Sequence, residues 1–332
     1  MLIDTHIHHY PDIYLDFLKQ RKEPPFIINR DEYDRFIMFS DTINWKEGKG
    51  LKILPDFYSY EEKLDSMQKN NVDRAVLSLG NPWLDFIPIS ESISMANEIN
   101  NQFSRICVQY SDQFWGLACL PAGDLDASIE EVKRIKDLPG IVGILMSSKL
   151  GNGWIDENQV IPFWELINDI NIPVFIHPYY SVGGTQLANY DDMLRFSLGF
   201  PFETTFIATR LIMSGILDIF PNLRIILAHG GGAFPSLVGR IEAYCSGRII
   251  EKIKYPIKHY LRMFYYDAIT YSPQLLRFIS ETVGVDRLVF GTDYPFAAND
   301  TNSLVQTVLH ANFARIEQEM IFSENAIRLF SK

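Results

Sequence analysis

The stretch RIILAHGGG, residues 224–232, is an aliphatic run that starts after one arginine and ends on a histidine and three glycines. Short apolar runs of this kind, almost without charge, are typical of strands buried on both faces of a parallel sheet. The runs occur at 2–6, 74–79, 114–120, 141–146, 172–177, 224–229, 263–269 and 287–290. Between them, amphipathic segments such as 59–71, 126–137 and 161–170 predict helices. Eight strands alternating with helices predict an α/β (β/α)8 TIM barrel, with a doubly wound open sheet as the alternative.

The predicted barrel has one long connection. No linker or internal repeat divides the 332 residues, so we expect a single domain over 1–332. The segment 10–58 follows the first strand, carries mixed charge with little periodicity, and is longer than an ordinary connection. An insertion at this place is expected to lie over the barrel mouth as a lid.

The composition limits the class of protein and partner. Hydrophobic residues make up 47% of the chain and the mean hydropathy is −0.02, which suits a large core without disulfides. A net charge of −11 and a pI near 5.1 disfavour nucleic acid and anionic membranes, and favour a small-molecule substrate. The first residues form a charged, histidine-rich strand, which predicts a cytoplasmic protein. Cys107, Cys119 and Cys245 are widely spaced and odd in number, which predicts buried free thiols.

Histidines gather at the predicted strand ends. His6 and His8 stand two residues apart, so that in a strand they project to the same side. His177 closes the fifth strand, His229 closes the sixth, and Asp293 follows the eighth. In a barrel, all of these positions lie on the C-terminal rim, where the catalytic groups of such enzymes gather. Three histidines with one carboxylate form a ligand set suited to Zn²⁺ with an open position.

Each of these residues also has a purely structural explanation. A histidine after a strand often serves as a hydrogen-bonded framework residue, and an aspartate before Tyr-Pro can cap a turn. Their convergence on one rim nevertheless favours a metal site. His9, His259 and His310 have no such placement, and we assign them to the surface or to packing.

Four stretches carry a resemblance to a known family: DTHIHHYP (4–11), FIHPYYSVGG (175–184), SGILDIFPNLRIILAHGGGAFPSLVGR (214–240) and GTDYPF (291–296). In this order and spacing, the chain resembles the branch of the amidohydrolase superfamily that contains aminocarboxymuconate semialdehyde decarboxylase and related nonoxidative decarboxylases. The resemblance implies that His6, His8, His177 and Asp293 bind one divalent metal ion, zinc in most members, with Mn²⁺ as the alternative. It also implies that His229 is an unligated acid or base.

The same resemblance implies substrate-binding residues. Arg240 is implied to bind a substrate carboxylate, reaching into the pocket of the neighbouring subunit of a homodimer. Tyr190 and Phe296 stand at positions of aromatic pocket residues. Apart from the resemblance, Trp83 follows the second strand in GNPWLDF, where it either points toward the site or packs under the lid. The family's second arginine lies in the segment after the first strand, where this chain offers Lys52 in GKGLKILP. Lysine is a point charge where arginine presents a fork, so the bound acid is expected to differ.

Two further positions bear on the site. Two-metal members of the superfamily use a modified lysine at the end of strand four, whereas this chain has Ser147 and Ser148 there. We interpret the following Lys149 as an ordinary solvated loop residue and expect one metal ion. Arg240 is expected on a helix after the sixth strand, where it either pairs with Glu242 at the surface or inserts across a dimer interface.

The sequence therefore predicts a metal-dependent nonoxidative decarboxylase, a carboxy-lyase acting on a small unsaturated or aromatic carboxylic acid. His229 or Asp293 is placed to protonate the carbanion that loss of CO₂ leaves. The alternative is a metal-dependent hydrolase of an ester, lactone or amide that uses a zinc-activated water. Arg240 and the aromatic residues favour decarboxylation. A catalytically inactive, ligand-binding barrel is disfavoured because every rim residue is present.

Overall fold

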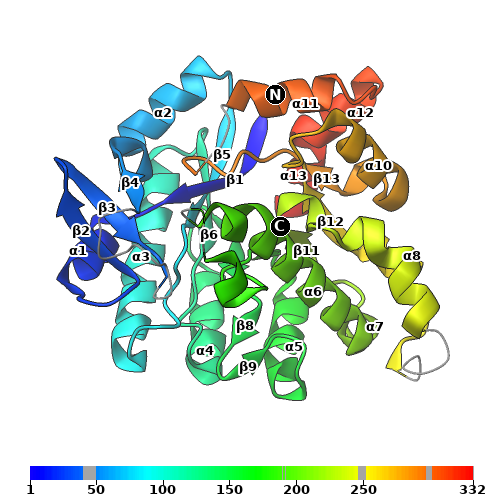
Figure 1. Ribbon diagram of the computed structural model, residues 1–332, viewed down its shortest axis with the longest axis horizontal. Helices are drawn as coiled ribbons and strands as arrows, with labels where there is room; N and C mark the ends of the chain where they lie inside the picture. Colours follow the sequence, from blue (N-terminus) through cyan, green and yellow to red (C-terminus); the bar gives the residue numbers. More distant parts are fainter. Residues whose placement is uncertain (40–49, 189, 191, 246–251, 297–300, 332) are drawn as a thin grey trace.

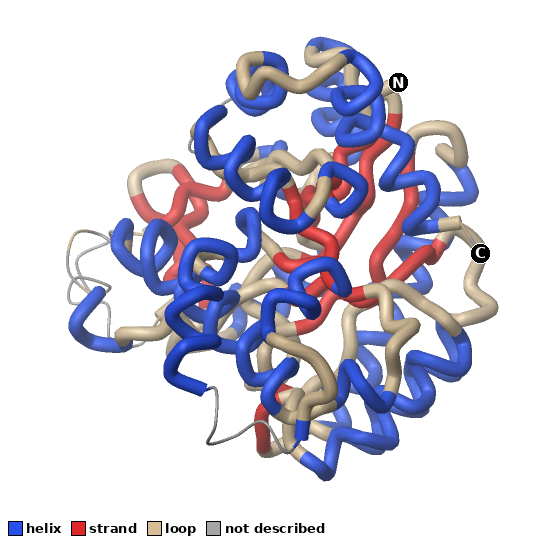
Figure 2. The backbone as a smooth tube through the Cα atoms, turned by 90° about the vertical axis from the view of Figure 1, so that its right-hand side faces the viewer, coloured by secondary structure: helices blue, strands red, loops and turns tan. Residues whose placement is uncertain are grey.

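A barrel of eight parallel strands forms the centre of the molecule (Figures 1 and 2). The computed structural model describes residues 1–39, 50–188, 190, 192–245, 252–296 and 301–331. The eight-stranded sheet has the order β1-β5-β6-β7-β10-β11-β12-β13. The strands are Ile3–His9, Arg74–Leu79, Phe114–Ala118, Ile141–Met146, Val174–Ile176, Ile225–Leu227, Phe264–Asp267 and Leu288–Val289. All strand pairs in this sheet are parallel, as the uncharged runs predicted.

The sheet closes through contacts between β1 and the segment that starts at β13. The backbone N–H of Thr5 donates to the carbonyl of Phe290 at 2.9 Å, and the N–H of His8 donates to the carbonyl of Tyr294 at 2.7 Å. An open sheet would leave both of its edge strands unpaired at these places. The predicted (β/α)8 barrel is therefore confirmed, and the doubly wound open sheet is wrong.

Helices surround the barrel, and Figure 2 shows them on the outside of the strands. They are α2 Tyr60–Lys69, α3 Ile89–Gln109, α4 Leu125–Ile135, α5 Ile161–Ile170, α6 Phe200–Met213, α7 Ile216–Ile219, α8 Phe234–Cys245, α9 Ile257–Tyr260, α10 Pro273–Val283, α11 Thr301–Leu309, α12 Arg315–Glu319 and α13 Asn325–Phe330. The predicted helices at 59–71, 126–137 and 161–170 are confirmed as α2, α4 and α5. Local capping sets their starts: Asp124 accepts the backbone N–H of Ala127 at 2.9 Å and so begins α4.

The strand boundaries differ from the predicted ones in a way that matters for the site. β1 runs through His9, so His6 and His8 lie within this strand rather than at its end. β10 and β11 stop one and two residues before His177 and His229. His177 therefore stands in the loop after β10, and His229 begins the short 3-10 helix His229–Gly231 after β11. His229 has a φ of 56°, and the three glycines after it also have positive φ, which lets the chain turn sharply away from β11.

The segment between β1 and α2 is more regular than its sequence indicated. It contains helix α1, Asp12–Gln20, and a three-stranded antiparallel sheet of β2 Phe26–Arg30, β3 Tyr33–Ile37 and β4 Leu51–Ile53, on the left of Figure 1. Residues 40–49 of the predicted lid lie outside the described residues. The segment is tied to the loop after β5, because its tyrosine hydroxyls donate to backbone carbonyls there. Its role as a lid stays a prediction.

The cysteines and His9 have the surroundings that the sequence predicted, with one exception. Cys107 and Cys119 are buried free thiols as predicted, whereas Cys245, also free, is partly exposed. No helix among the described residues is long and apolar enough to cross a membrane. His9 is buried and stacks on Tyr60 with ring centroids 4.0 Å apart, which confirms its assignment to packing.

Candidate metal centre

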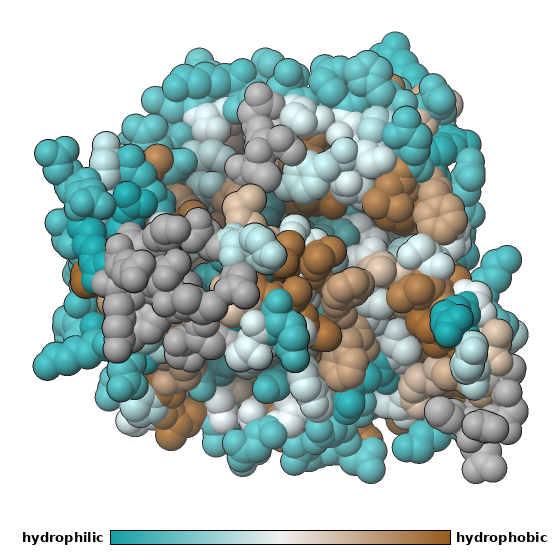
Figure 3. Space-filling model, in the orientation of Figure 1, coloured by the Kyte–Doolittle hydropathy of each residue, from teal (hydrophilic) through white to brown (hydrophobic). Residues whose placement is uncertain are grey.

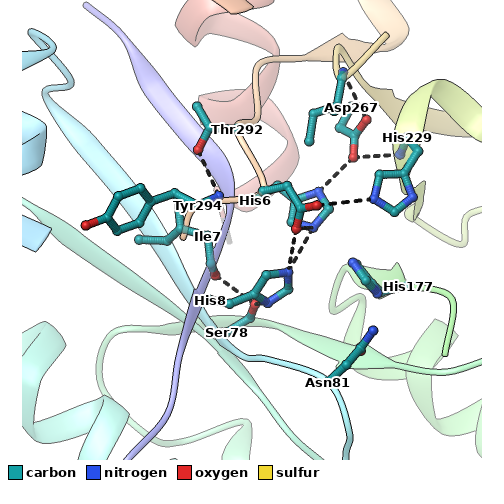
Figure 4. A network of polar contacts seen from close by, with 12 residues as sticks. His6, Ile7, His8, Ser78, Asn81, His177, His229, Asp267, Thr292 and Tyr294 are labelled. Carbon is teal, nitrogen blue, oxygen red and sulfur yellow. Dashed lines mark hydrogen bonds and ion pairs between the residues drawn. The ribbon is translucent and has the colours of Figure 1, made fainter. Parts of the chain in front are cut away.

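Four imidazoles and one carboxylate meet at the C-terminal rim of the barrel (Figure 4). Single ligand atoms of His6, His177, His229 and Asp293 all lie within 4.8 Å of one another. Nε2 of His8 lies 3.1 Å from Nε2 of His6 and 3.1 Å from Oδ1 of Asp293. The structure thus brings together all five rim residues that the sequence singled out, from strands far apart in the chain.

The spacing of these atoms fits a divalent cation. Nε2 of His6 lies 3.4 Å from Oδ1 of Asp293 and 3.1 Å from Nε2 of His8. Ligand atoms that each lie about 2.1 Å from one ion are roughly 3.0 to 3.4 Å apart in octahedral or tetrahedral geometry. Nε2 of His177 is buried and has no hydrogen-bond partner among the described residues. A buried nitrogen lone pair without a donor is the atom that a bound cation would satisfy.

The two imidazoles of β1 are oriented through their other ring nitrogen. Nδ1 of His6 lies 2.8 Å from Oδ2 of Asp267. Nδ1 of His8 lies 3.0 Å from Oγ of Ser78, and that hydroxyl donates its own hydrogen to the carbonyl of Ile7 at 2.8 Å. Both Nδ1 atoms therefore carry the hydrogen, and both Nε2 atoms keep a free lone pair. Orientation of this kind is the usual arrangement behind metal-binding histidines.

His177 is held in the same way. Its Nδ1 donates to the carbonyl of Pro178 at 2.9 Å, and the amide of Asn81 donates to the same carbonyl at 3.1 Å. Figure 4 shows the His177 ring facing those of His6 and His8. The three imidazoles therefore direct Nε2 toward a common region.

His229 differs from these three histidines. Its Nδ1 is buried without an acceptor among the described residues, and its Nε2 lies 3.7 Å from Oδ2 of Asp293. Its side chain is 15% exposed, whereas the side chains of His6 and His8 are almost fully buried. A ring that is less restrained and partly open to the mouth is suited to exchange a proton with a bound molecule.

Burial and the neighbouring charged groups together shift the pKa values of the cluster. Burial lowers the pKa of His8, and lowers the pKa of His177 well below its usual range. Burial also acts to lower the pKa of His6, but the neighbouring carboxylates outweigh it and raise this pKa. For Asp293 burial acts to raise the pKa, but the neighbouring imidazoles of His229, His8 and His6 outweigh it and hold the pKa well below the usual range. Metal binding requires neutral imidazoles and an ionised carboxylate. The pKa shifts of His8, His177 and Asp293 favour these states, whereas that of His6 opposes its neutral form.

The sequence prediction missed Asp267, which is fully buried at the end of β12. Besides His6, it accepts the backbone N–H of His229 at 2.9 Å and that of Gly230 at 2.9 Å. One carboxylate therefore orients an imidazole of β1 and fixes the start of the loop after β11. The sequence feature that could have identified Asp267 is that it is the only charged residue in FYYDAIT, residues 264–270.

Two of the predicted aromatic residues stand beside the cluster. The ring centroid of Phe296 lies 5.5 Å from that of His8. Trp83 is 3% exposed, and its ring lies 5.6 Å from that of His177, while its indole N–H donates to a backbone carbonyl. Apolar walls of this kind can hold a planar ligand and exclude water.

The structure does not bring three other predicted residues to the cluster. Tyr190 is 72% exposed. The ammonium of Lys52 lies 3.1 Å from the ring centroid of Tyr33, on the small antiparallel sheet. Arg240 lies on the exposed side of α8, with its guanidinium 4.7 Å from the ring centroid of Tyr244. Within this one chain, none of them reaches the imidazoles.

The prediction that Lys149 is a solvated loop residue is wrong. It belongs to β8, Lys149–Leu150, which pairs with β9, Gly153–Trp154, and its side chain is half-buried. Its ammonium lies 4.1 Å from the ring centroid of Tyr180 and 4.9 Å from that of Trp154, which is a cation–π arrangement.

Comparison with known proteins gives consistent results. The family model described as amidohydrolase matches residues 3–332. A 2-amino-3-carboxymuconate-6-semialdehyde decarboxylase of Dictyostelium discoideum is 27% identical over 80% of this chain and 74% of its own length. A gamma-resorcylate decarboxylase of Rhizobium sp. strain MTP-10005 is 29% identical over 81% of this chain and 86% of its own. The crystal structure of IDCase from Metarhizium anisopliae in apo form has a TM-score of 0.93 and 28% identity, covering 99% of this chain and 97% of that one.

Proposed function

This chain belongs to the amidohydrolase family, and we propose that it is a metal-dependent nonoxidative decarboxylase of a small aromatic or unsaturated carboxylic acid. The observation that carries the proposal is the convergence of three oriented imidazole nitrogens on the carboxylate of Asp293. The decarboxylases among its relatives, each similar over about four fifths of this chain, support the reaction class. The acid that this protein decarboxylates is proposed only by class.

We propose that His6, His8, His177 and Asp293 bind one divalent ion, and that His229 does not bind it. Support comes from the ring nitrogens: Nδ1 of each proposed ligand histidine has an acceptor, whereas Nδ1 of His229 has none among the described residues. Three imidazole nitrogens and one carboxylate oxygen match Zn²⁺, and Mn²⁺ is the alternative.

The reaction follows from charge and proton transfer. A divalent ion held by His6, His8, His177 and Asp293 would supply positive charge to attract the carboxylate substrate and stabilise negative charge that develops on it. When the bond between the carboxyl group and the adjacent carbon breaks, CO₂ leaves and the electron pair stays on that carbon. His229 is the proposed donor of the proton that this carbon takes, and Asp293, 3.7 Å from it, is the second candidate. Trp83 and Phe296 flank the cluster, and their rings would pack on a planar acid.

The reaction class is tested with a substrate panel. Metal-replete protein is incubated in D₂O with carboxylated phenols, carboxylated pyrimidines and muconate-like acids, and in parallel with lactones and esters. We expect CO₂ from at least one planar acid, one deuterium on the carbon that lost it, and loss of both after chelation. Turnover of a lactone or ester with no CO₂ from any acid would instead support the hydrolase.

We also propose that the chain forms a homodimer in which Arg240 reaches the partner's site. Figure 3 shows apolar side chains gathered in the middle of the face and toward α8. Exposed apolar residues of the segment after β10 and of α8 are Val182, Tyr190, Met193, Phe196, Leu198, Phe202, Leu237 and Tyr244. Arg240 stands beside the last of these, and among the described residues no ion pair joins it to Glu242.

Subunit mixing is expected to restore activity between two inactive variants. His229→Asn chains are mixed with Arg240→Ala chains; if Arg240 acts on the partner's site, each mixed dimer has one site with both changes and one with neither. Activity should return to about half of the wild-type value per mixed dimer. Subunit exchange is verified by native mass spectrometry. If exchange occurs and no activity returns, Arg240 does not act across the interface.

We propose that residues 1–332 form one domain in which 10–58 lies over the barrel mouth. The ring of Phe57, in this segment, lies 5.3 Å from that of Phe296 beside the cluster, which supports a position near the mouth. A cytoplasmic location and the lack of nucleic acid or membrane partners stay predictions from charge and composition.

A further inference from the structure

A buried glutamate on α6 binds the loop that follows β10. Glu203 is 1% exposed. Its Oε2 accepts the backbone N–H of Tyr179 at 3.1 Å and that of Ser181 at 2.7 Å. Its Oε1 accepts the hydroxyl hydrogen of Ser148, which stands between β7 and β8, at 2.5 Å. One side chain therefore joins a helix, a strand end and the loop of His177.

This loop determines the direction of the His177 ring. The carbonyl of Pro178 accepts Nδ1–H of His177, so the position of the carbonyl sets the ring plane and the direction of Nε2. The two N–H groups that Glu203 binds belong to Tyr179 and Ser181, the first and third residues after Pro178. Glu203 therefore holds the backbone that follows this carbonyl, whereas β10 holds the backbone that precedes His177.

Burying the carboxylate of Glu203 costs free energy that an apolar side chain at this position would not. Burial raises the pKa of Glu203, while its hydrogen bonds with Ser148 and the loop backbone lower it. A buried carboxylate is tolerated only where donors surround it, and here the donors include the backbone of a loop that carries a proposed metal ligand.

We propose that Glu203 is a positioning residue that, together with Ser148, holds His177 in the orientation needed to bind the metal ion. The inference rests on the proposed metal site. It gives Ser148 a role near the end of the fourth strand of the barrel, where two-metal members of the superfamily use a modified lysine. Neither residue is proposed to touch the ion or the substrate.

The test measures metal geometry rather than turnover. The full-length protein is freed of metal and titrated with Co²⁺, whose visible absorption reports coordination geometry. Glu203→Leu should weaken Co²⁺ binding by about 10- to 100-fold and change the absorption bands, as loss of outer-sphere support does in other sites. Glu203→Gln should stay close to the wild type, because its amide oxygen can accept both backbone N–H groups and its NH₂ can donate to Ser148.

A matched control separates this role from a general loss of stability. Glu131 on α4 is also a buried carboxylate, and it accepts the amide of Asn100 at 2.6 Å. Glu131→Leu should lower the melting temperature but leave the Co²⁺ affinity and spectrum unchanged. A folded Glu203→Leu protein with wild-type affinity and bands would overturn the inference.

If Glu203→Leu fails to fold, Ser148→Ala is tested instead, because it removes the hydroxyl that donates to Glu203. Unchanged Co²⁺ absorption bands in Ser148→Ala would overturn the inference. If the wild type itself binds no Co²⁺, then the proposed metal site fails rather than the role of Glu203. The two failures are therefore distinguishable.

Discussion

Replacement of His177 by alanine is expected to remove most of the bound metal while the barrel stays folded. Nε2 of His177 is buried without a partner among the described residues, and its ring centroid lies 4.9 Å from that of His6. Loss of a direct ligand should weaken binding by more than the roughly 10- to 100-fold that outer-sphere changes cause. The fold should survive because the residue stands in a loop at the rim, and not among the apolar strand residues.

The measurement is elemental analysis after dialysis against a fixed free-metal concentration, with circular dichroism to confirm the fold. His310→Ala provides the control, because that histidine is exposed on the outside of the molecule. Both zinc and manganese are measured, so that the same experiment identifies the ion that the wild type retains. A full complement of metal in His177→Ala would remove this residue from the ligand set.

Replacement of His229 by asparagine is expected to leave the metal in place and to lower kcat by about 10²- to 10⁴-fold. His229 has a positive φ at a sharp turn, its backbone is held by Asp267, and its Nε2 lies 3.7 Å from Asp293. Asparagine readily adopts the left-handed backbone, so the loop should persist without the imidazole. The loss should therefore appear in proton transfer and not in folding or metal content.

The measurement combines kcat, metal content and deuterium incorporation for the acid that gives most CO₂ in the panel. Unchanged turnover with full metal would assign the proton transfer to Asp293 or to water. Simultaneous loss of metal and turnover would instead place His229 among the ligands, since its ligand atom lies within 4.8 Å of those of His6 and His177.

The parts of the fold and site that the sequence predicted are those with a strong periodic or positional signal. Strands buried on both faces need an unbroken apolar run, so they were visible in the sequence, although their ends were not. His6 and His8 were found because strand residues two apart share a face. Once the barrel was predicted, His177 and Asp293 followed from their positions after apolar runs.

The missed features depend on contacts between distant parts of the chain. Asp267 resembles any isolated aspartate until the fold places it 2.8 Å from Nδ1 of His6, 261 residues away. Lys149 was misjudged because one of the rings that cover it, Tyr180, belongs to another loop. The small sheet after β1 was missed because its short strands are partly exposed and lack a clear apolar period. No local pattern in the sequence encodes such partners.

The closure of the barrel has a consequence for how the protein is made. His8 and Asp293, which meet at 3.1 Å, are separated by 285 residues, and they come from the two ends of the sheet that closes. During synthesis the first two histidines leave the ribosome long before the aspartate, so a nascent chain lacks a complete ligand set until nearly all of it has emerged. With the proposed ligand set, metal binding is therefore a late event, and the ion would link β1 to the segment that follows β13. In cells starved of the metal, we expect the contacts between β1 and the segment after β13 to open before the apolar core of the barrel does.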